Sequence, residues 1–190
     1  MCGIAFEHAE SVKILVAAGN LTSAACLIRL QYEAFVRAMW LKYSASDRSV
    51  SKLMGVLSDE TAEQVGKRLP MLTEMLRKLD GRAPDEMLRM LLGFKEYSLK
   101  PLNSFVHGGI HAIHRHSKGY PVELLFKLLR NSNGISILVG MLLVTLHGDG
   151  APVGRITALQ KEFRDCLPES RPPEKPTEAD QSGSPAKTPK

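Results

Sequence analysis

Residues 22–46 constrain the fold more than any other part of the chain, because they form one long predicted helix that is apolar on nearly every side. Projected at about 100° per residue, the segment has one narrow side that we expect to be exposed, formed by Gln31, Ala38 and Lys42. Elsewhere Leu, Met, Ala and Glu are frequent, and the alternation of apolar and polar residues that is typical of strands is scarce. The sequence therefore predicts an all-α fold.

Helix-start and helix-stop signals divide the rest of the chain. Gly19-Asn20 is a common helix stop, Lys100-Pro101 marks a predicted break, and Gly119-Tyr120-Pro121 ends another element. The segment after Pro121 forms one helix, or two with a break near residues 131–134. The predicted helices cover residues 4–18, 22–46, 47–57, 58–79 with a bend at Pro70, 84–97, 102–116, 121–146 and 153–167.

The domain organisation follows from length and from a change in composition near the end of the chain. A chain of 190 residues is long enough for one domain with a core of its own. From residue 168 onward the chain is rich in Pro, Ser, Glu and Lys and has no large apolar residue. We therefore expect one helical bundle over residues 1–167 and a disordered tail over 168–190.

Charge and cysteine usage indicate the partners and the compartment. The net charge is +5 and the isoelectric point is near 9.2, which suits an anionic partner such as RNA. Cys2, Cys26 and Cys166 lie far apart and form no CxxC pair, so neither a disulfide framework nor a cysteine-ligated zinc is expected. A reducing, cytoplasmic location follows.

No targeting or membrane-spanning segment is expected. The first eleven residues include acidic residues and no basic n-region, unlike a secretory signal. The longest apolar run, residues 135–146, is shorter than the roughly 20 residues that a span needs. We interpret that run as a buried core helix and expect no membrane association.

The candidate functional segment is residues 102–116, which hold four of the six histidines of the chain. Wound as one helix, the segment places a polar face about 100° wide opposite an apolar one. Gly108-Gly109 falls in the middle of this helix, where glycine is tolerated mainly if another backbone approaches closely. The residues of the polar face are Asn103, Ser104, His107, His111 and His114.

A second polar feature lies on the 22–46 helix, where Arg29, Glu33 and Arg37 follow one another at one-turn spacing on the side opposite Gln31 and Lys42. Charges among apolar neighbours are costly unless they are paired or open to a cleft. We therefore expect either a buried ion pair that joins two helices or the wall of a cleft shared with the histidine segment.

The first hypothesis for function is a metal-independent ribonuclease that uses no cofactor. His107 would be the general acid or base when a 2′-hydroxyl attacks its neighbouring phosphate, and Arg37 would stabilise the developing negative charge. Ser104 and Asn103 would position the phosphate, and Glu33 would lie beside Arg37 in the same cleft. No Walker A, GxGxxG or GxSxG motif indicates another reaction.

Two alternatives remain open. His107, His111 and His114 have the spacing of ligands on one helix face and could bind a metal ion, although three ligands on a straight helix span about 10 Å and converge poorly. In the other alternative the polar face packs against the Arg29–Glu33–Arg37 side, and the protein is a binding module for RNA, a nucleotide or a partner protein that performs no chemistry.

The motif LNSFVH resembles the RNxxxH signature of the HEPN superfamily, with Asn103 and His107 in the asparagine and histidine positions and Leu102 in the arginine position. The stretch RLQYEAFVRAMWLKYSAS is similar to the Arg/Glu helix of bacterial HEPN-like families. The resemblance covers about residues 20–147. It implies a small all-α bundle, a homodimer in which two motifs line one cleft, and ribonuclease activity in bacterial toxin–antitoxin, phage-defence or stress systems. A cognate antitoxin or another partner protein belongs to the same expectation.

Overall fold

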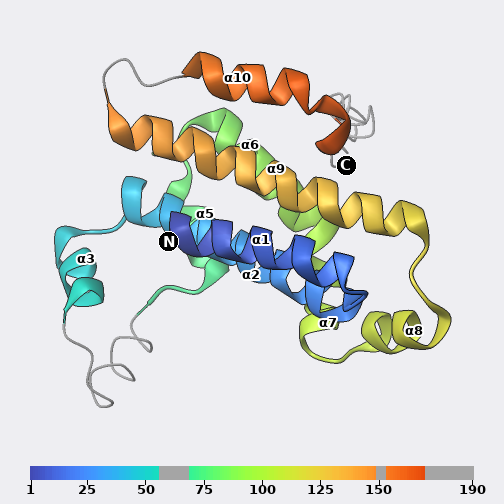
Figure 1. The fold of residues 1–190 in the computed structure, drawn as a ribbon. Helices are drawn as coiled ribbons and strands as arrows, with labels where there is room; N and C mark the ends of the chain where they lie inside the picture. Colours follow the sequence, from blue (N-terminus) through green and yellow to red (C-terminus); the bar gives the residue numbers. More distant parts are fainter. Residues whose placement is uncertain (56–68, 149–152, 170–190) are drawn as a thin grey trace, which may run out of the picture.

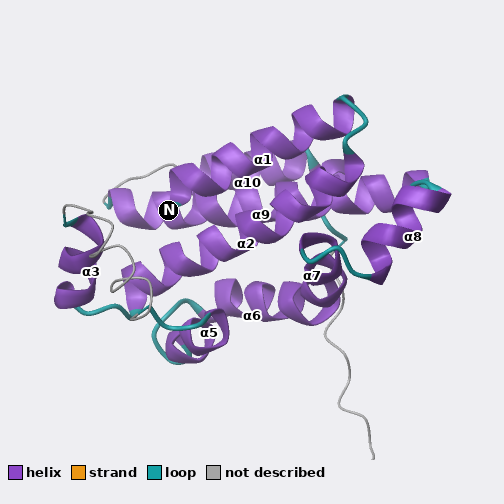
Figure 2. Ribbon diagram, turned by 90° about the horizontal axis from the view of Figure 1, so that it is seen from below, coloured by secondary structure: helices purple, strands orange, loops and turns teal. Residues whose placement is uncertain are grey.

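The computed structural model describes residues 1–55, 69–148 and 153–169, and within these ranges it contains helices and no strand (Figures 1 and 2). The predicted all-α fold is confirmed. The predicted tail, 168–190, lies outside the described residues except for Pro168 and Glu169.

The helix α2 (Leu21–Tyr43) is the centre of the fold. It packs against the helices α1 (Cys2–Ala17), α5 (Leu72–Leu79), α7 (Lys100–Val106) and α9 (Val122–His147), so that most of its residues are buried (Figure 2). The predicted turn between α1 and α2 is present, and Gly19 takes the left-handed conformation, with φ of +77°, that glycine allows.

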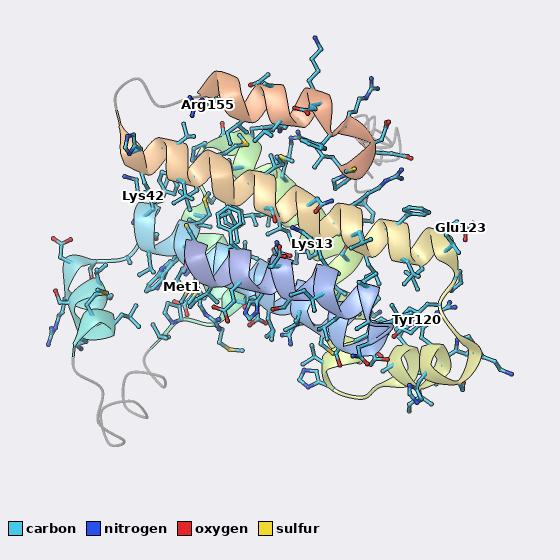
Figure 3. The ribbon with its side chains drawn as sticks, viewed as in Figure 1. Met1, Lys13, Lys42, Tyr120, Glu123 and Arg155 are labelled. Atoms are coloured by element: carbon cyan, nitrogen blue, oxygen red, sulfur yellow. The ribbon has the colours of Figure 1, made fainter. Side chains whose placement is uncertain are left out.

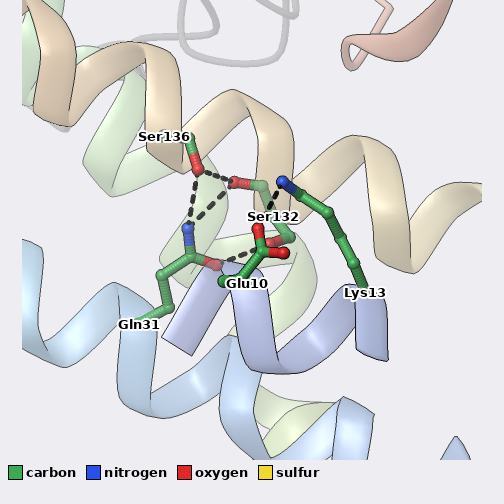
Figure 4. Close-up of polar contacts among 5 residues, drawn as sticks. All are labelled: Glu10, Lys13, Gln31, Ser132 and Ser136. Carbon is green, nitrogen blue, oxygen red and sulfur yellow. Dashed lines mark hydrogen bonds and ion pairs between the residues drawn. The ribbon is translucent and has the colours of Figure 1, made fainter. Parts of the chain in front are cut away.

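The predicted exposed side of α2 is wrong for two of its three residues. Gln31 is 0% exposed and Ala38 is 7% exposed, and of the three only Lys42 is exposed. The amide of Gln31 donates to the carbonyl of Ser132 and to Ser136 Oγ and accepts from Ser132 Oγ at 2.7 Å, as Figure 4 shows. Because α9 satisfies the amide, a polar residue lies in the interface instead of facing water.

The predicted break at Lys100-Pro101 is also wrong. The chain continues from α6 (Asp85–Phe94) through a π turn at Lys95–Leu99 into α7. Proline removes one backbone donor and its ring collides with the carbonyl four residues earlier in an α-helix. The wider π turn just before Pro101 changes that pairing, and the helix accommodates the proline without ending.

The predicted single helix over residues 102–116 is two helices, α7 and α8 (Ile110–Lys118). Gly108 has φ of +62°, and the amide of Gly109 donates to the carbonyl of Ser104 at 2.7 Å, which ends α7. A Cβ on Gly109 would lie 2.6 Å from Ser104 Oγ, so the close neighbour is this preceding serine and not the backbone of another element. His107 is therefore at a helix end and does not share a continuous face with His111.

The helix α9 is one element, which settles the choice that the sequence left open. α10 (Val153–Glu162) and the 3₁₀ turn at Arg164–Cys166 cover it where two glycines leave room. A Cβ on Gly140 would lie 3.1 Å from Ile156, and one on Gly134 would lie 2.8 Å from Pro168.

Among the described residues α9 is also the one helix long and apolar enough to cross a membrane, a test that core helices of soluble proteins pass too.

The remaining described helix is α3 (Asp47–Met54), which begins at the predicted residue and has Ser46 as its N-cap. Ser46 Oγ accepts a hydrogen bond from the amide of Ser49. Residues 56–68, which hold the end of the predicted 47–57 helix and the first half of the predicted 58–79 helix, lie outside the described residues. α5 begins just after the predicted bend at Pro70.

The break at Gly108 makes a prediction about stability. Gly108→Ala should lower the free energy of unfolding by about 1 kcal/mol, because an L residue is strained at positive φ. Gly93→Ala, near the end of α6 where the helix continues into the π turn and nothing lies within 4 Å, should instead raise it by roughly 0.5–1 kcal/mol. Urea denaturation of both variants measures the difference. Stabilisation by both alanines would indicate the continuous 102–116 helix.

Candidate functional site

The charged stripe on α2 is an ion-pair ladder within one helix. Glu33 lies 2.7 Å from the guanidinium of Arg29 and 3.6 Å from that of Arg37, with all three at i,i+4 spacing. The Glu33 and Arg29 side chains are only 13% and 19% exposed, whereas Arg37 is 44% exposed. The expected association of Glu33 with Arg37 is present, and Arg29 holds the same carboxylate more closely.

Arg29 is incompletely satisfied in this ladder. Its Nε is buried and has no hydrogen-bond partner among the described residues. The same is true of Oδ1 of Asn103 on α7. A buried donor without an acceptor costs about 1–3 kcal/mol, so the remaining contact with Glu33 matters more than a surface pair would.

The contacts of two tyrosines, Tyr32 and Tyr120, fix how the α6–α7 segment lies along α2. Near the middle of α2 the Tyr32 hydroxyl donates to the carbonyl of Leu91, and its ring stacks on Phe94 at 4.7 Å. At the start of α2 the hydroxyls of Thr22 and Tyr120 lie 3.0 Å apart, and the Tyr120 ring stacks against Phe105 at 6.2 Å (Tyr120 is labelled in Figure 3). The α6–α7 segment therefore runs antiparallel to α2.

This register separates the two halves of the predicted catalytic site. His107, two residues after Phe105, lies at the level of Thr22, while Arg37 lies beyond Tyr32 on the other half of α2. Arg37 follows Thr22 by fifteen residues, which is about 22 Å of helix axis. The chain brings Glu33 and Arg37 together and does not bring them to His107, so one chain alone does not form the predicted cleft.

The residues around His107 have structural contacts of their own. Ser104 Oγ accepts a hydrogen bond from the backbone amide of His111 at 3.0 Å and so caps the start of α8. Leu102, in the arginine position of the motif, is 3% exposed and belongs to the hydrophobic core. A charged side chain at this position would be buried, whereas leucine packs there without that cost.

The helix α8 is exposed, basic and poorly buried. Only Ala112 of its nine residues is buried, and His111 stacks on Phe105 with ring centroids 6.5 Å apart. His107, His111, His114 and His116 are all exposed. Over the part of the chain that the structure describes, no group of three or more His, Cys, Asp or Glu side chains is arranged to hold a metal ion. The geometry gives the metal hypothesis no support.

The sequence interpretation of this segment missed its cations. Residues 97–122 contain Lys100, Arg115 and Lys118 with the four histidines, and no Asp or Glu. The signal was available, since an acid-free run of this length in a chain with 20 acidic residues is uneven.

The ion-pair ladder predicts an unequal response to charge removal. Glu33→Gln should lower the free energy of unfolding by about 1–2 kcal/mol, because it leaves the mostly buried Arg29 guanidinium without its carboxylate. The matched control is Glu86→Gln, which removes an exposed carboxylate from an exposed Arg89 pair and should have no measurable effect. Chemical denaturation of both variants tests this, and equal effects would contradict a structural role for Glu33.

Comparison with known proteins gives one match. No curated protein and no solved structure matches the chain. A family model described as a family of unknown function (DUF6988) matches residues 2–169, which include every helix described above. On this match, the chain is a member of the DUF6988 family.

Proposed function

We propose that this protein is a HEPN-like helical module that binds RNA through residues 97–122, which we call the basic segment. The observation that carries the proposal is the exposed, acid-free helix α8 within this segment. Phosphate contacts by Lys, Arg and protonated His supply most of the affinity in sequence-independent RNA binding. The net charge of +5 acts in the same direction.

The packing of α8 supports a role outside the core. A helix that served only to fill the bundle would bury an apolar stripe, yet Ile110 and Ile113 are 72% and 61% exposed. Exposed apolar and imidazole groups beside cations can contact unstacked bases while the cations contact phosphates. Single-stranded or looped RNA fits this surface better than a regular duplex does.

Ribonuclease activity is the second candidate, and the exposure of His107 at the end of α7 is the observation that favours it. An exposed imidazole can reach a 2′-hydroxyl and act as general base. Since Arg37 of the same chain is too distant, the arginine would come from a second copy, in agreement with the homodimer that the HEPN resemblance implies. A cytoplasmic toxin or defence protein with a partner protein belongs to this same proposal.

RNA binding should depend on the charges of the basic segment. The double variant Arg115→Gln/Lys118→Gln should bind a labelled single-stranded RNA more weakly, and the slope of log affinity against log salt should fall by about 1.4, or about 0.7 for each lost contact. The control Arg155→Gln/Lys161→Gln removes two exposed charges from α10 and should change neither quantity. Fluorescence anisotropy across a salt series measures both, and equal losses in the two variants would exclude a specific surface.

Cleavage has a separate test that includes the two-chain arrangement. Active protein should cut RNA in EDTA and leave a 2′,3′-cyclic phosphate, and His107→Ala or Arg37→Ala should each lower the rate by about 100-fold. If the site combines His107 of one copy with Arg37 of another, an equal mixture of the two inactive variants should recover about a quarter of the activity. Intact RNA at concentrations where binding is saturated would exclude the ribonuclease and leave the binding function.

A further inference from the structure

A polar pocket of about 280 Å³ lies at the end of α2 opposite to the basic segment. It is formed where the end of α2, the start of α3 and the end of α5 come together. None of its lining residues is acidic, and two are cationic. The lining residues are Trp40, Ser44, Ser46, Ser49, Lys78 and Arg82.

Trp40 provides the observation that points to a ligand. The residue is only 4% exposed, and its Nε1, the one polar atom of the ring, is buried with no hydrogen-bond partner among the described residues. Indole N–H is a donor only and usually finds an acceptor when it is buried. The described residues supply no acceptor for this N–H, and the pocket that Trp40 lines, which has no acidic lining residue, can admit one.

The other lining groups are also donors. Arg82 is exposed and has no ion-pair partner in the described ranges, while Lys78 Nζ lies 2.8 Å from Glu74 on its own helix. Ser44 Oγ donates to the carbonyl of Lys78, which joins the end of α2 to α5. This bond fixes the distance between the two helices that line the pocket. The guanidinium of Arg82 can therefore pair with an anionic ligand.

The serines at the start of α3 complete the donor set. The Ser46 and Ser49 hydroxyls lie 3.0 Å apart, so one of the two hydrogens is free to point to a ligand. Ser46 is also the N-cap of an eight-residue helix, where the backbone dipoles favour negative charge.

From this arrangement we propose that the pocket binds a phosphate group carried by a small metabolite such as a nucleoside monophosphate. Phosphate has three terminal oxygens that accept several hydrogen bonds at once, which matches an indole N–H, serine hydroxyls, an ammonium and a guanidinium better than a carboxylate does. The pocket is larger than a bare phosphate ion requires, which leaves room for part of the attached group. The proposal does not rest on RNA binding by the basic segment, because the two surfaces lie at opposite ends of α2.

The test uses Trp40 itself, since it is the only tryptophan of the chain. The full chain, labelled with ¹⁵N, is titrated with inorganic phosphate, with adenosine monophosphate, and with adenosine and sodium chloride at matched ionic strength. Both phosphate compounds should shift the indole N–H resonance downfield and change the fluorescence in a saturable way, while adenosine and chloride should not. Tighter binding of the monophosphate identifies a phosphorylated metabolite, and equal binding identifies the phosphate ion. No saturable shift with either compound would overturn the proposal.

Charge variants distinguish a site from general attraction. Arg82→Gln should weaken binding of the tighter phosphate compound by about tenfold or more. Arg77→Gln, an exposed residue of α5 that does not line the pocket, should change the dissociation constant by less than about twofold. Equal weakening by both variants would overturn the proposal.

Trp40→Phe, measured by calorimetry after a thermal melt has shown that it folds, should also weaken binding because it removes the N–H and keeps a ring. Unchanged affinity in that variant would also overturn the role of Trp40.

Discussion

The hydrogen bonds of the Gln31 amide decide how the central helix lies in the bundle. An amide that is 0% exposed must have partners, and all of its partners are on α9 at Ser132 and Ser136. Hydrophobic contact alone would tolerate small rotations of α2, whereas this network holds one rotation and one register. Rotation of α2 then determines which of its residues meet α7, α5 or water.

The sequence predicted the parts of the fold that depend on local signals. The turn at Gly19 and the i,i+4 pairing of Glu33 with Arg37 follow from backbone preference and helical spacing, and both are present. The prediction of the exposed side of α2 was wrong because a hydropathy pattern assigns every amide side chain to the solvent-exposed face. Gln31 is buried only because α9, about a hundred residues later, brings Ser132 to it, and no local pattern contains that contact.

The errors around the candidate site have a different origin. A helical projection assumes one continuous axis, and Gly108 ends that axis by taking a left-handed conformation. Gly93, also preceded by a predicted helical segment, stays helical, so the residue type alone does not predict the break. The π turn before Pro101 likewise keeps a helix intact where a proline predicts an end. The sequence selects His107, Ser104 and Arg37 by residue type and helical spacing alone. Their separation along α2 could not be predicted, because it depends on the antiparallel register that Tyr32 and Tyr120 impose.

One face of α2 connects the two ends of the molecule at which we place function. Thr22, Arg29, Glu33 and Trp40 are seven, four and seven residues apart, and at about 100° per residue these spacings return each to nearly the same direction. Thr22 holds the start of the basic segment through Tyr120, and Trp40 forms the wall of the polar pocket. Between them, the unpartnered Nε of Arg29 lies on the same face as the unpartnered Nε1 of Trp40. Buried donors without acceptors cost about 1–3 kcal/mol each, and apolar residues would avoid that cost. The Tyr43 hydroxyl at the end of the same helix is a third buried polar group without a partner among the described residues, so α2 carries polar groups at a cost in stability.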